Sequence, residues 1–234
     1  MTVSDDVIFH ELECWGYDAD LPLWRDLAAV YGGPIVDLGA GTGRVSLDLA
    51  AAGYDVIAVD LDPVLLDALS HPRIRTVTAD IRELTLDERV PLVVIPMQTV
   101  QLLGGAEGRA ALFTALRGVL QPDGVIAAAI AEHVEPYSAD AQVPFVIAER
   151  EGVQFESDPY AIVEDGDAYV LHHARIRRDP DGTEHSTVQH TRLARLDAGT
   201  LEREAEAHGL RVLPRRVVDQ TDEHVGSTVV MLGA

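Results

Sequence analysis

Between residues 34 and 130, short apolar runs alternate with segments whose apolar residues recur at helical spacing. Apolar runs this short, bounded by polar or turn residues, are typical of strands buried on both faces of a sheet. The pattern predicts strands over 34–37, 56–60, 74–78, 91–96 and 125–130, and helices over 23–30, 45–52, 61–70 and 112–120, with a turn at 121–124 before the last strand. This alternation predicts a parallel sheet covered by helices on both faces.

After about residue 134 the pattern becomes that of antiparallel strands joined by turns rich in Asp, Gly and Pro. The middle section is interpreted as a β-rich insertion over the sheet, because its ends return to the same core. Thr200 is expected to cap a short helix that ends at Gly209. The expected strands are 160–163, 168–177 and 183–193 in the insertion, and 211–218 and 227–232 as a final pair.

Composition narrows the function classes. The chain has 234 residues, of which 47% are hydrophobic and 24% charged, as in globular enzymes. Its apolar runs are shorter than the ~18 residues of a membrane span, and the acidic start lacks the features of a signal peptide, so a cytoplasmic protein is expected. The net charge of -21 and the absence of a basic stripe argue against a nucleic-acid partner. Cys14, the single cysteine, excludes an internal disulfide and a multi-cysteine metal site.

A glycine-rich turn, Asp-Leu-Gly-Ala-Gly-Thr-Gly at 37–43, lies between the first expected strand and a helix. Glycines there permit a tight turn and let a ligand approach the exposed backbone N–H groups. The dinucleotide fingerprint requires a small residue three places after its second glycine, for close helix packing. That place is Arg44 here, so the spacing argues against a dinucleotide fold.

The segment from Val36 to Gly43 resembles the first motif of the class I S-adenosylmethionine-dependent methyltransferases, small-molecule type. The resemblance covers roughly residues 34–130. It implies an α/β, Rossmann-like, seven-stranded mostly parallel sheet with its last strand antiparallel, plus an inserted antiparallel β-lid. One domain of four parts is expected: a helical cover over 1–31, a cofactor-binding core over 32–133, the lid over 134–196, and a final helix and strand pair over 197–234.

The same resemblance assigns residues to S-adenosyl-L-methionine. Asp60, at the end of the second strand, occupies the place of the acid that binds the ribose hydroxyls, and a carboxylate suits two hydroxyl donors. Asp80 occupies the place of the acid that accepts from the adenine amino group. Asp37 is expected near the amino-acid end of the cofactor. The full expected set is Asp37, Gly39, Ala40, Gly41, Gly43, Asp60, Leu61, Asp80, Ile81 and Pro96.

The expected acceptor side lies beyond the fourth strand. The sequence from Ile95 to Leu103 is similar to the acceptor loop of small-molecule N- and O-methyltransferases, with Gln98 and Gln101 at its polar places. Some sugar-amine methyltransferases of this type have a histidine where Gln101 stands, and a glutamine orients an acceptor without taking its proton. His133, just past the fifth strand, is the candidate base, with a surface-loop histidine as the alternative.

Tyr17 belongs to a Tyr-Asp segment that resembles the one covering the cofactor in small-molecule members of the family, which implies that Tyr17 either bonds the cofactor carboxylate or lines the sulfonium. No metal is expected: His172 and His173 are strand neighbours that point to opposite faces and cannot share an ion without distortion. The predicted function is methyl transfer to N or O of a small molecule by direct displacement, in a monomer or homodimer with no nucleic-acid or membrane partner. The alternatives are a non-catalytic cofactor- or metabolite-sensing module and, less favoured, a nicotinamide-dependent oxidoreductase.

Overall fold

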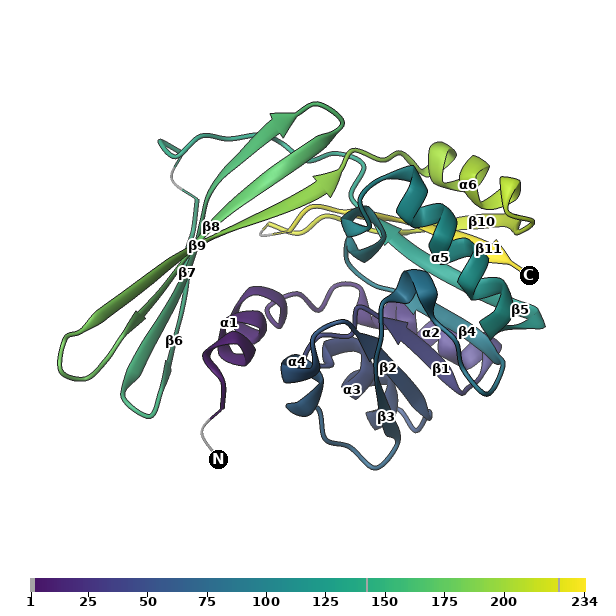
Figure 1. The fold of residues 1–234 in the computed structure, drawn as a ribbon, viewed down its shortest axis with the longest axis horizontal. Helices are drawn as coiled ribbons and strands as arrows, with labels where there is room; N and C mark the ends of the chain where they lie inside the picture. The colour runs from purple at the N-terminus through teal and green to yellow at the C-terminus, as the bar shows by residue number, and fades with distance from the viewer. Residues whose placement is uncertain (1–2, 142, 223) are drawn as a thin grey trace. The chain divides into compact units, whose positions relative to one another are not determined.

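The computed structural model describes residues 3–141, 143–222 and 224–234. The chain forms two compact units (Figure 1). The first, here called the β-unit, comprises residues up to Gly16 together with Val134–Arg195. The second, the αβ-unit, comprises Tyr17–His133 and Leu196–Ala234.

The αβ-unit is built on a seven-stranded sheet in the order β10-β11-β5-β4-β1-β2-β3. Neighbouring strands are parallel from β5 to β3, whereas β11, the last strand of the chain, runs antiparallel to both β5 and β10. The predicted fold class is therefore confirmed. The strands are β1 (Ile35–Leu38), β2 (Val56–Asp60), β3 (Ile74–Thr78), β4 (Val90–Ile95), β5 (Leu120–Ile130), β10 (Arg211–Val218) and β11 (Ser227–Gly233).

Helices cover both faces of this sheet. Alternate residues of a strand point to opposite faces, so apolar residues of one strand pack against helices on both sides. Val36 and Leu38 pack with the buried residues of α5 and α6, whereas Ile35 packs with those of α2 and α3. All three side chains are fully buried. The helices of the unit are α2 (Leu21–Tyr31), α3 (Arg44–Ala51), α4 (Pro63–Asp67), α5 (Ala106–Val119) and α6 (Ala198–Ala207), with short 3-10 helices η1 (Ile81–Glu83) and η2 (Thr99–Leu102).

Four predicted boundaries were wrong. The helix expected over 112–120 is α5, which begins earlier, at Ala106, and ends at Val119, so that Leu120 belongs to β5. The helix expected over 61–70 begins only at Pro63, because the Asp62 side chain caps it by accepting the N–H of Val64. The turn expected at 121–124 is a bulged stretch inside β5, which follows α5 without a loop. The cap of α6 is Asp197, which accepts the N–H of Thr200, and Thr200 itself lies in the first turn.

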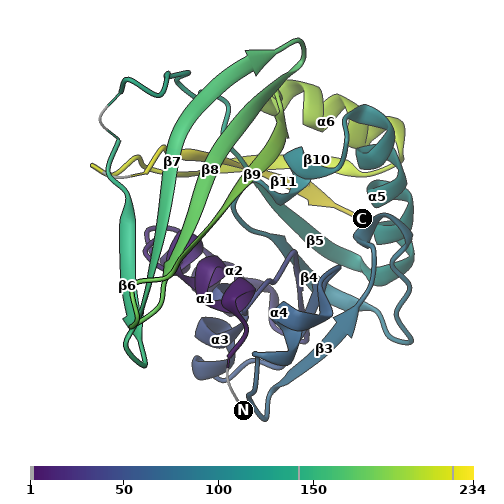
Figure 2. The same cartoon turned by 60° about the vertical axis from the view of Figure 1, so that its left-hand side comes forward.

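The β-unit is a four-stranded antiparallel sheet in the order β6-β7-β8-β9, with α1 lying against it (Figure 2). The ring of Phe9 on α1 packs edge-on against Phe155 at 5.4 Å between centroids, which anchors the helix. The strand predicted over 160–163 is the end of a longer β7, and β6 was not predicted. The elements are α1 (Asp5–Cys14), β6 (Val146–Arg150), β7 (Val153–Asp165), β8 (Ala168–Arg178) and β9 (Glu184–Ala194).

Candidate cofactor and acceptor site

The glycine turn lies at the carboxyl end of β1 in a conformation that depends on its glycines. Gly39, Gly41 and Gly43 have φ angles of 73°, 54° and 89°, in the left-handed region that side-chain-bearing residues rarely adopt. A Cβ built on Gly39 would lie 2.6 Å from Cγ2 of Thr99, so the turn passes directly against the segment that follows β4. The N–H groups of Gly39 and Ala40 both donate to the carbonyl of Val59, which joins the turn to β2.

Asp60, at the end of β2, ties the turn to the neighbouring strand through its carboxylate. One carboxylate oxygen accepts the N–H of Gly41 at 2.8 Å, and the other accepts the N–H of Asp62 at 3.0 Å. The side chain is only partly buried, and each carboxylate oxygen retains capacity for a further donor. The next side chain, Leu61, is 69% exposed, so a large apolar group is presented to solvent beside this acid.

Asp37 is a buried carboxyl with one unsatisfied oxygen. Ser46 donates a 2.6 Å hydrogen bond to Oδ2, whereas Oδ1 is buried and has no hydrogen-bond partner among the described residues. Burial raises the pKa of Asp37 to about 6, an effect that the Ser46 bond and the nearby charge of Arg44 only partly offset. A buried carboxyl with a free acceptor beside a glycine turn is poised to accept from a donor such as an ammonium group.

Asp80 and Ile81 follow β3 at the same edge of the sheet. The Asp80 carboxylate caps η1 by accepting the N–H of Arg82, and it also accepts the Arg82 guanidinium, with Nη2 at 2.6 Å. These bonds from Arg82 lower the pKa of Asp80, so the carboxylate stays charged. Ile81 is buried in the core beneath it. An adenine amino group at this place would share the Asp80 carboxylate with Arg82.

Gln101 fixes the segment that follows β4 to the residue that follows β5. Its amide nitrogen donates to the carbonyl of Ala131 at 3.2 Å, and its amide oxygen accepts the N–H of Ala131 at 2.8 Å. The side chain is 1% exposed, so its amide is engaged in joining η2 to the end of β5. Gln98 is half-buried at the start of η2, next to the buried Pro96.

The carboxyl end of β5 carries Glu132 and His133, which differ in environment. One carboxylate oxygen of Glu132 accepts the N–H of Ala198 at 2.8 Å, at the start of α6, and the other accepts the hydroxyl of Thr228 at 2.5 Å. Glu132 thus links three elements of the αβ-unit. His133 is exposed.

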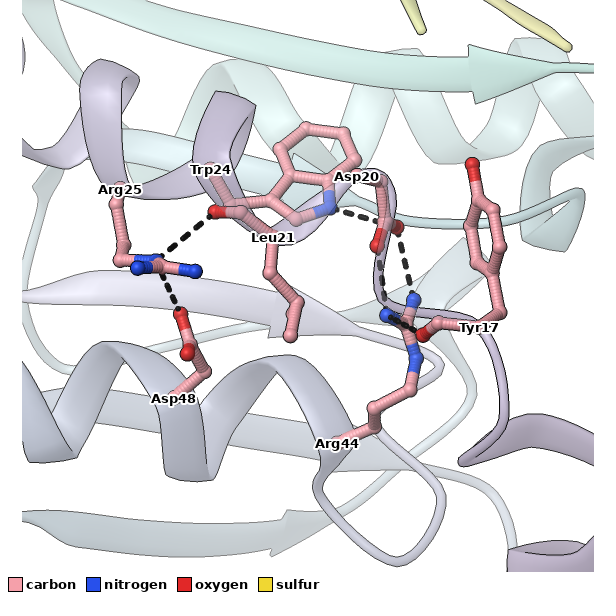
Figure 3. A network of polar contacts seen from close by, with 7 residues as sticks. All are labelled: Tyr17, Asp20, Leu21, Trp24, Arg25, Arg44 and Asp48. Carbon is pink, nitrogen blue, oxygen red and sulfur yellow. Dashed lines mark hydrogen bonds and ion pairs between the residues drawn. The ribbon is translucent and has the colours of Figure 1, made fainter. Parts of the chain in front are cut away.

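Tyr17 lies beside Arg44, the residue that follows the glycine turn (Figure 3). The carbonyl of Tyr17 accepts a 2.7 Å bond from Arg44, and Asp20 binds the same guanidinium. The pairing of Asp20 with Arg44 has no local sequence signal, because the two residues stand 24 positions apart and nothing in that spacing marks a contact. The i, i+4 spacing of Asp20 and Trp24 was the only local signal of a network here.

The histidines and acids of the described residues were considered as a metal site. Among them, no group of three or more His, Cys, Asp or Glu side chains is placed to hold a metal ion. The ring of His172 packs edge-on against that of His190 at 4.6 Å between centroids. In the described parts of the chain, no helix is both long and apolar enough to cross a membrane.

Comparisons with known proteins agree with this arrangement. A family profile described as a methyltransferase domain matches residues 35–124. A Cypemycin N-terminal methyltransferase from a Streptomyces species is 35% identical over 136 residues, covering 52% of this chain and 56% of the relative. The chain spans about half the length of the curated relatives that it matches, since a putative methyltransferase from Bacillus subtilis is covered to 44%.

Solved structures share the whole fold. The sugar N-methyltransferase KedS8 from a Streptoalloteichus species has a TM-score of 0.73 at 17% identity, covering 98% of this chain and 93% of that one. The S-adenosylmethionine-bound amino pentose methyltransferase CalS10 from Micromonospora echinaspora has a TM-score of 0.71 at 18% identity, covering 99% and 98%. The fold and the methyltransferase-domain match over residues 35–124 make this chain similar to the class I S-adenosylmethionine-dependent methyltransferases. S-adenosyl-L-methionine is the cofactor of this family.

The residues present fit that cofactor. The unsatisfied buried oxygen of Asp37 is an acceptor for an ammonium group, and the carboxylate of Asp60 retains acceptor capacity beside the exposed Leu61. The glycines of the turn remove side chains that would otherwise obstruct approach to its backbone. These features lie at the carboxyl ends of adjacent parallel strands, where α/β sheets bind ligands.

Proposed function

We propose that this protein transfers a methyl group from S-adenosyl-L-methionine to an amine nitrogen of a small molecule. The observation that carries the choice of nitrogen is the engagement of Gln101. Both ends of its amide bind the backbone of Ala131, and the remaining side chains from Pro96 to Leu103 include no acid, histidine or other base. The acceptor segment therefore offers no group to remove a proton before attack.

The chemistry then favours an acceptor that needs no such group. The cofactor supplies an electrophilic methyl on a sulfonium, whose departure leaves a neutral thioether. A neutral amine attacks with its own lone pair and loses a proton afterwards to water, whereas an alcohol is a poor nucleophile until a base removes its proton. The task left to the chain is to align the nitrogen with the methyl and to exclude water. Gln98, half-buried after β4, is the side chain we assign to orient the acceptor.

The proposed cofactor residues are those that the family resemblance implies. Asp60 is proposed to accept the ribose hydroxyls, Asp80 the adenine amino group, and Asp37 the ammonium of the amino-acid end. The relatives are consistent with an amine acceptor: KedS8 is described as a sugar N-methyltransferase and CalS10 as an amino pentose methyltransferase.

A panel of matched acceptors tests this proposal. The purified protein is incubated with S-adenosylmethionine and an amino sugar, the corresponding sugar with a hydroxyl in place of the amine, or the N-acetylated amino sugar. S-adenosylhomocysteine release and acceptor mass are followed by mass spectrometry. Methylation of the free amine alone is expected. Methylation of the hydroxyl sugar, or turnover of the N-acetylated form, would contradict an amine acceptor.

The pH dependence gives a second, independent check. With two amines of different pKa, the rise of kcat/KM with pH is expected to follow the pKa of each acceptor, because the neutral amine is the reacting form. The substitution His133→Ala is expected to leave that profile in place. If a single enzyme pKa governed both acceptors and disappeared in His133→Ala, a general base would be required and the base-free proposal would fail.

A peptide α-amine is the second candidate acceptor, and the observation in its favour is the 35% identity to a Cypemycin N-terminal methyltransferase. The chemistry at nitrogen would be the same. A short peptide with a free N-terminus and its N-acetylated form are therefore added to the panel. Preference for the free peptide over every amino sugar would make the peptide the acceptor class.

A further inference from the structure

A buried ion pair joins the segment before α2 to the residue that follows the glycine turn. Nη1 of Arg44 donates to Oδ1 of Asp20 at 2.6 Å, and Nη2 donates to Oδ2 at 2.8 Å. Figure 3 shows the Asp20 carboxylate between this guanidinium and the indole of Trp24, whose N–H also donates to it at 2.8 Å. The carboxylate therefore holds the start of α2 and the start of α3 together.

This pair is unusual in its burial. The side chains of Arg44 and Asp20 are 8% and 2% exposed, and Trp24 is not exposed at all. A buried bidentate ion pair has strongly preferred geometry. Loss of one partner would leave the charge of the other buried and unpaired. The pair is therefore a rigid link and not a solvated surface contact.

The same guanidinium fixes Tyr17. Nη1 of Arg44 donates to the Tyr17 carbonyl at 2.7 Å, and the guanidinium lies 5.1 Å from the centroid of the Tyr17 ring. The Tyr17 hydroxyl is buried and makes no hydrogen bond of normal geometry with the described residues, although Ser227 lies close to it. Burial raises the pKa of Tyr17, so the hydroxyl keeps its proton and can donate a hydrogen bond to a ligand.

We propose that Arg44 and Asp20 are positioning residues that hold the Tyr17 hydroxyl in place for the carboxylate of S-adenosylmethionine. This inference rests on the proposed function. Because Arg44 directly follows Gly43, one guanidinium sets both the exit of the glycine turn and the place of Tyr17. Cofactor affinity then depends on the pair, although neither of its members touches the cofactor.

A second ion pair between the same two helices supplies a matched control. Arg25 on α2 lies 3.1 Å from Asp48 on α3, but its side chain is 48% exposed (Figure 3). Loss of an exposed pair has little effect on stability. The substitution Arg25→Gln therefore tests whether any weakening of the contact between α2 and α3 lowers cofactor affinity.

The experiment measures S-adenosylhomocysteine binding by calorimetry in single and paired variants. Asp20→Asn, Arg44→Lys and Tyr17→Phe are each expected to lower the affinity about tenfold or more. Arg25→Gln is expected to bind as the wild type does. The double variant Arg44→Lys with Tyr17→Phe is expected to lose no more affinity than Tyr17→Phe alone, because both substitutions remove the same interaction.

Two further measurements separate positioning from folding. The paired variant Asp20→Leu with Arg44→Met replaces the buried pair by apolar groups, which commonly preserves stability. It is expected to fold, as shown by cooperative unfolding, and to bind at least tenfold more weakly. In a Trp15→Phe background, fluorescence of Trp24 reports the Asp20 contact and is expected to change with Asp20→Asn.

The outcomes are distinguishable. Wild-type affinity in the folded paired variant, or additive losses in the double variant of Arg44 and Tyr17, would overturn the positioning role and leave the methyltransferase assignment intact. Absence of S-adenosylhomocysteine binding in the wild-type protein would instead overturn the proposed function. Equal losses in Arg25→Gln and Arg44→Lys would reduce the pair to a general packing contact.

Discussion

The carboxylate of Asp60 accepts the backbone N–H of Gly41 at 2.8 Å, so the acid that ends β2 holds the glycine turn that follows β1. The two strands are parallel neighbours, which brings their carboxyl ends to one edge. A single side chain therefore shapes the turn and, by the proposal above, meets the ribose. Structure and binding are coupled at this residue.

We predict that Asp60→Ala weakens S-adenosylhomocysteine binding by about 1.5–3 kcal/mol, because a charge-assisted hydrogen bond is lost. Asp60→Asn is expected to lose less, since its amide oxygen can still accept the N–H of Gly41. Calorimetry measures both. Asp62→Ala is the control for loss of a neighbouring acidic side chain, since the Asp62 side chain caps α4. Unchanged affinity in Asp60→Ala would remove the ribose assignment.

Asp37 predicts a pH dependence of stability in the cofactor-free protein. Its folded pKa is raised to about 6 from 3.8, so between these values the folded chain holds a proton that the unfolded chain releases. The free energy of unfolding contributed by this group is therefore greatest below the unfolded pKa and falls as pH rises through about 6. From pH 5 to pH 8 the fall is about 1 to 2 kcal/mol.

Asp37→Asn isolates this contribution, because the amide stays neutral at every pH. Urea unfolding of the wild type and the variant from pH 5 to 8 should show their difference shifting in favour of the variant as pH rises. A difference independent of pH would show that the carboxyl titrates at its ordinary value.

Cofactor binding should depend on pH in the opposite sense. The ionised carboxylate of Asp37 is the form that attracts an ammonium, so affinity for S-adenosylmethionine is expected to rise as pH increases through about 6. Calorimetry at pH 5 and pH 7.5 measures this rise, with Asp37→Asn as the variant that should lack it. A rise of equal size in the variant would assign the effect to another group.

Gln101 and Gln98 are predicted to respond differently to the same change. Gln101→Leu leaves the buried N–H and carbonyl of Ala131 unpaired and should lower the free energy of unfolding by about 2–4 kcal/mol. Gln98→Leu should leave stability within about 0.5 kcal/mol and reduce kcat/KM. Urea unfolding and steady-state kinetics separate the two; a purely kinetic defect in Gln101→Leu would contradict its structural engagement.

Glu132 is predicted to stabilise the packing of α6. Glu132→Ala removes the acceptor for the Ala198 N–H and the partner of the Thr228 hydroxyl, and should cost about 1–3 kcal/mol in the free energy of unfolding. Glu132→Gln should cost less, because its amide oxygen replaces one acceptor. Glu135→Ala, at a neighbouring exposed position, is the control. Equal stability of all three variants would show that the bonds of Glu132 contribute nothing.

The sequence predicted the sheet because its signals are local. A buried strand such as Val56–Asp60 is marked by an apolar run, and a glycine turn by residues that alone tolerate positive φ. The order of strand, turn and acid along the chain was enough to predict the methyltransferase resemblance and S-adenosyl-L-methionine as the cofactor. Boundaries were less well determined: the late start of α4 depends on a single cap by Asp62.

Only the tertiary structure decided what the polar side chains contact. Gln101 is a candidate for orienting the acceptor by its place in the loop, yet its amide binds Ala131, 30 residues away. In the sequence, Arg44 served only as an argument against a dinucleotide fold. The structure shows that its guanidinium binds Asp20. Residue type sets which bonds a side chain can make, but partners distant in sequence are brought together by packing. The sequence therefore determined the fold class and cofactor family, whereas the partners of Gln101, Arg44 and Glu132 emerged only once the strands and helices had been packed.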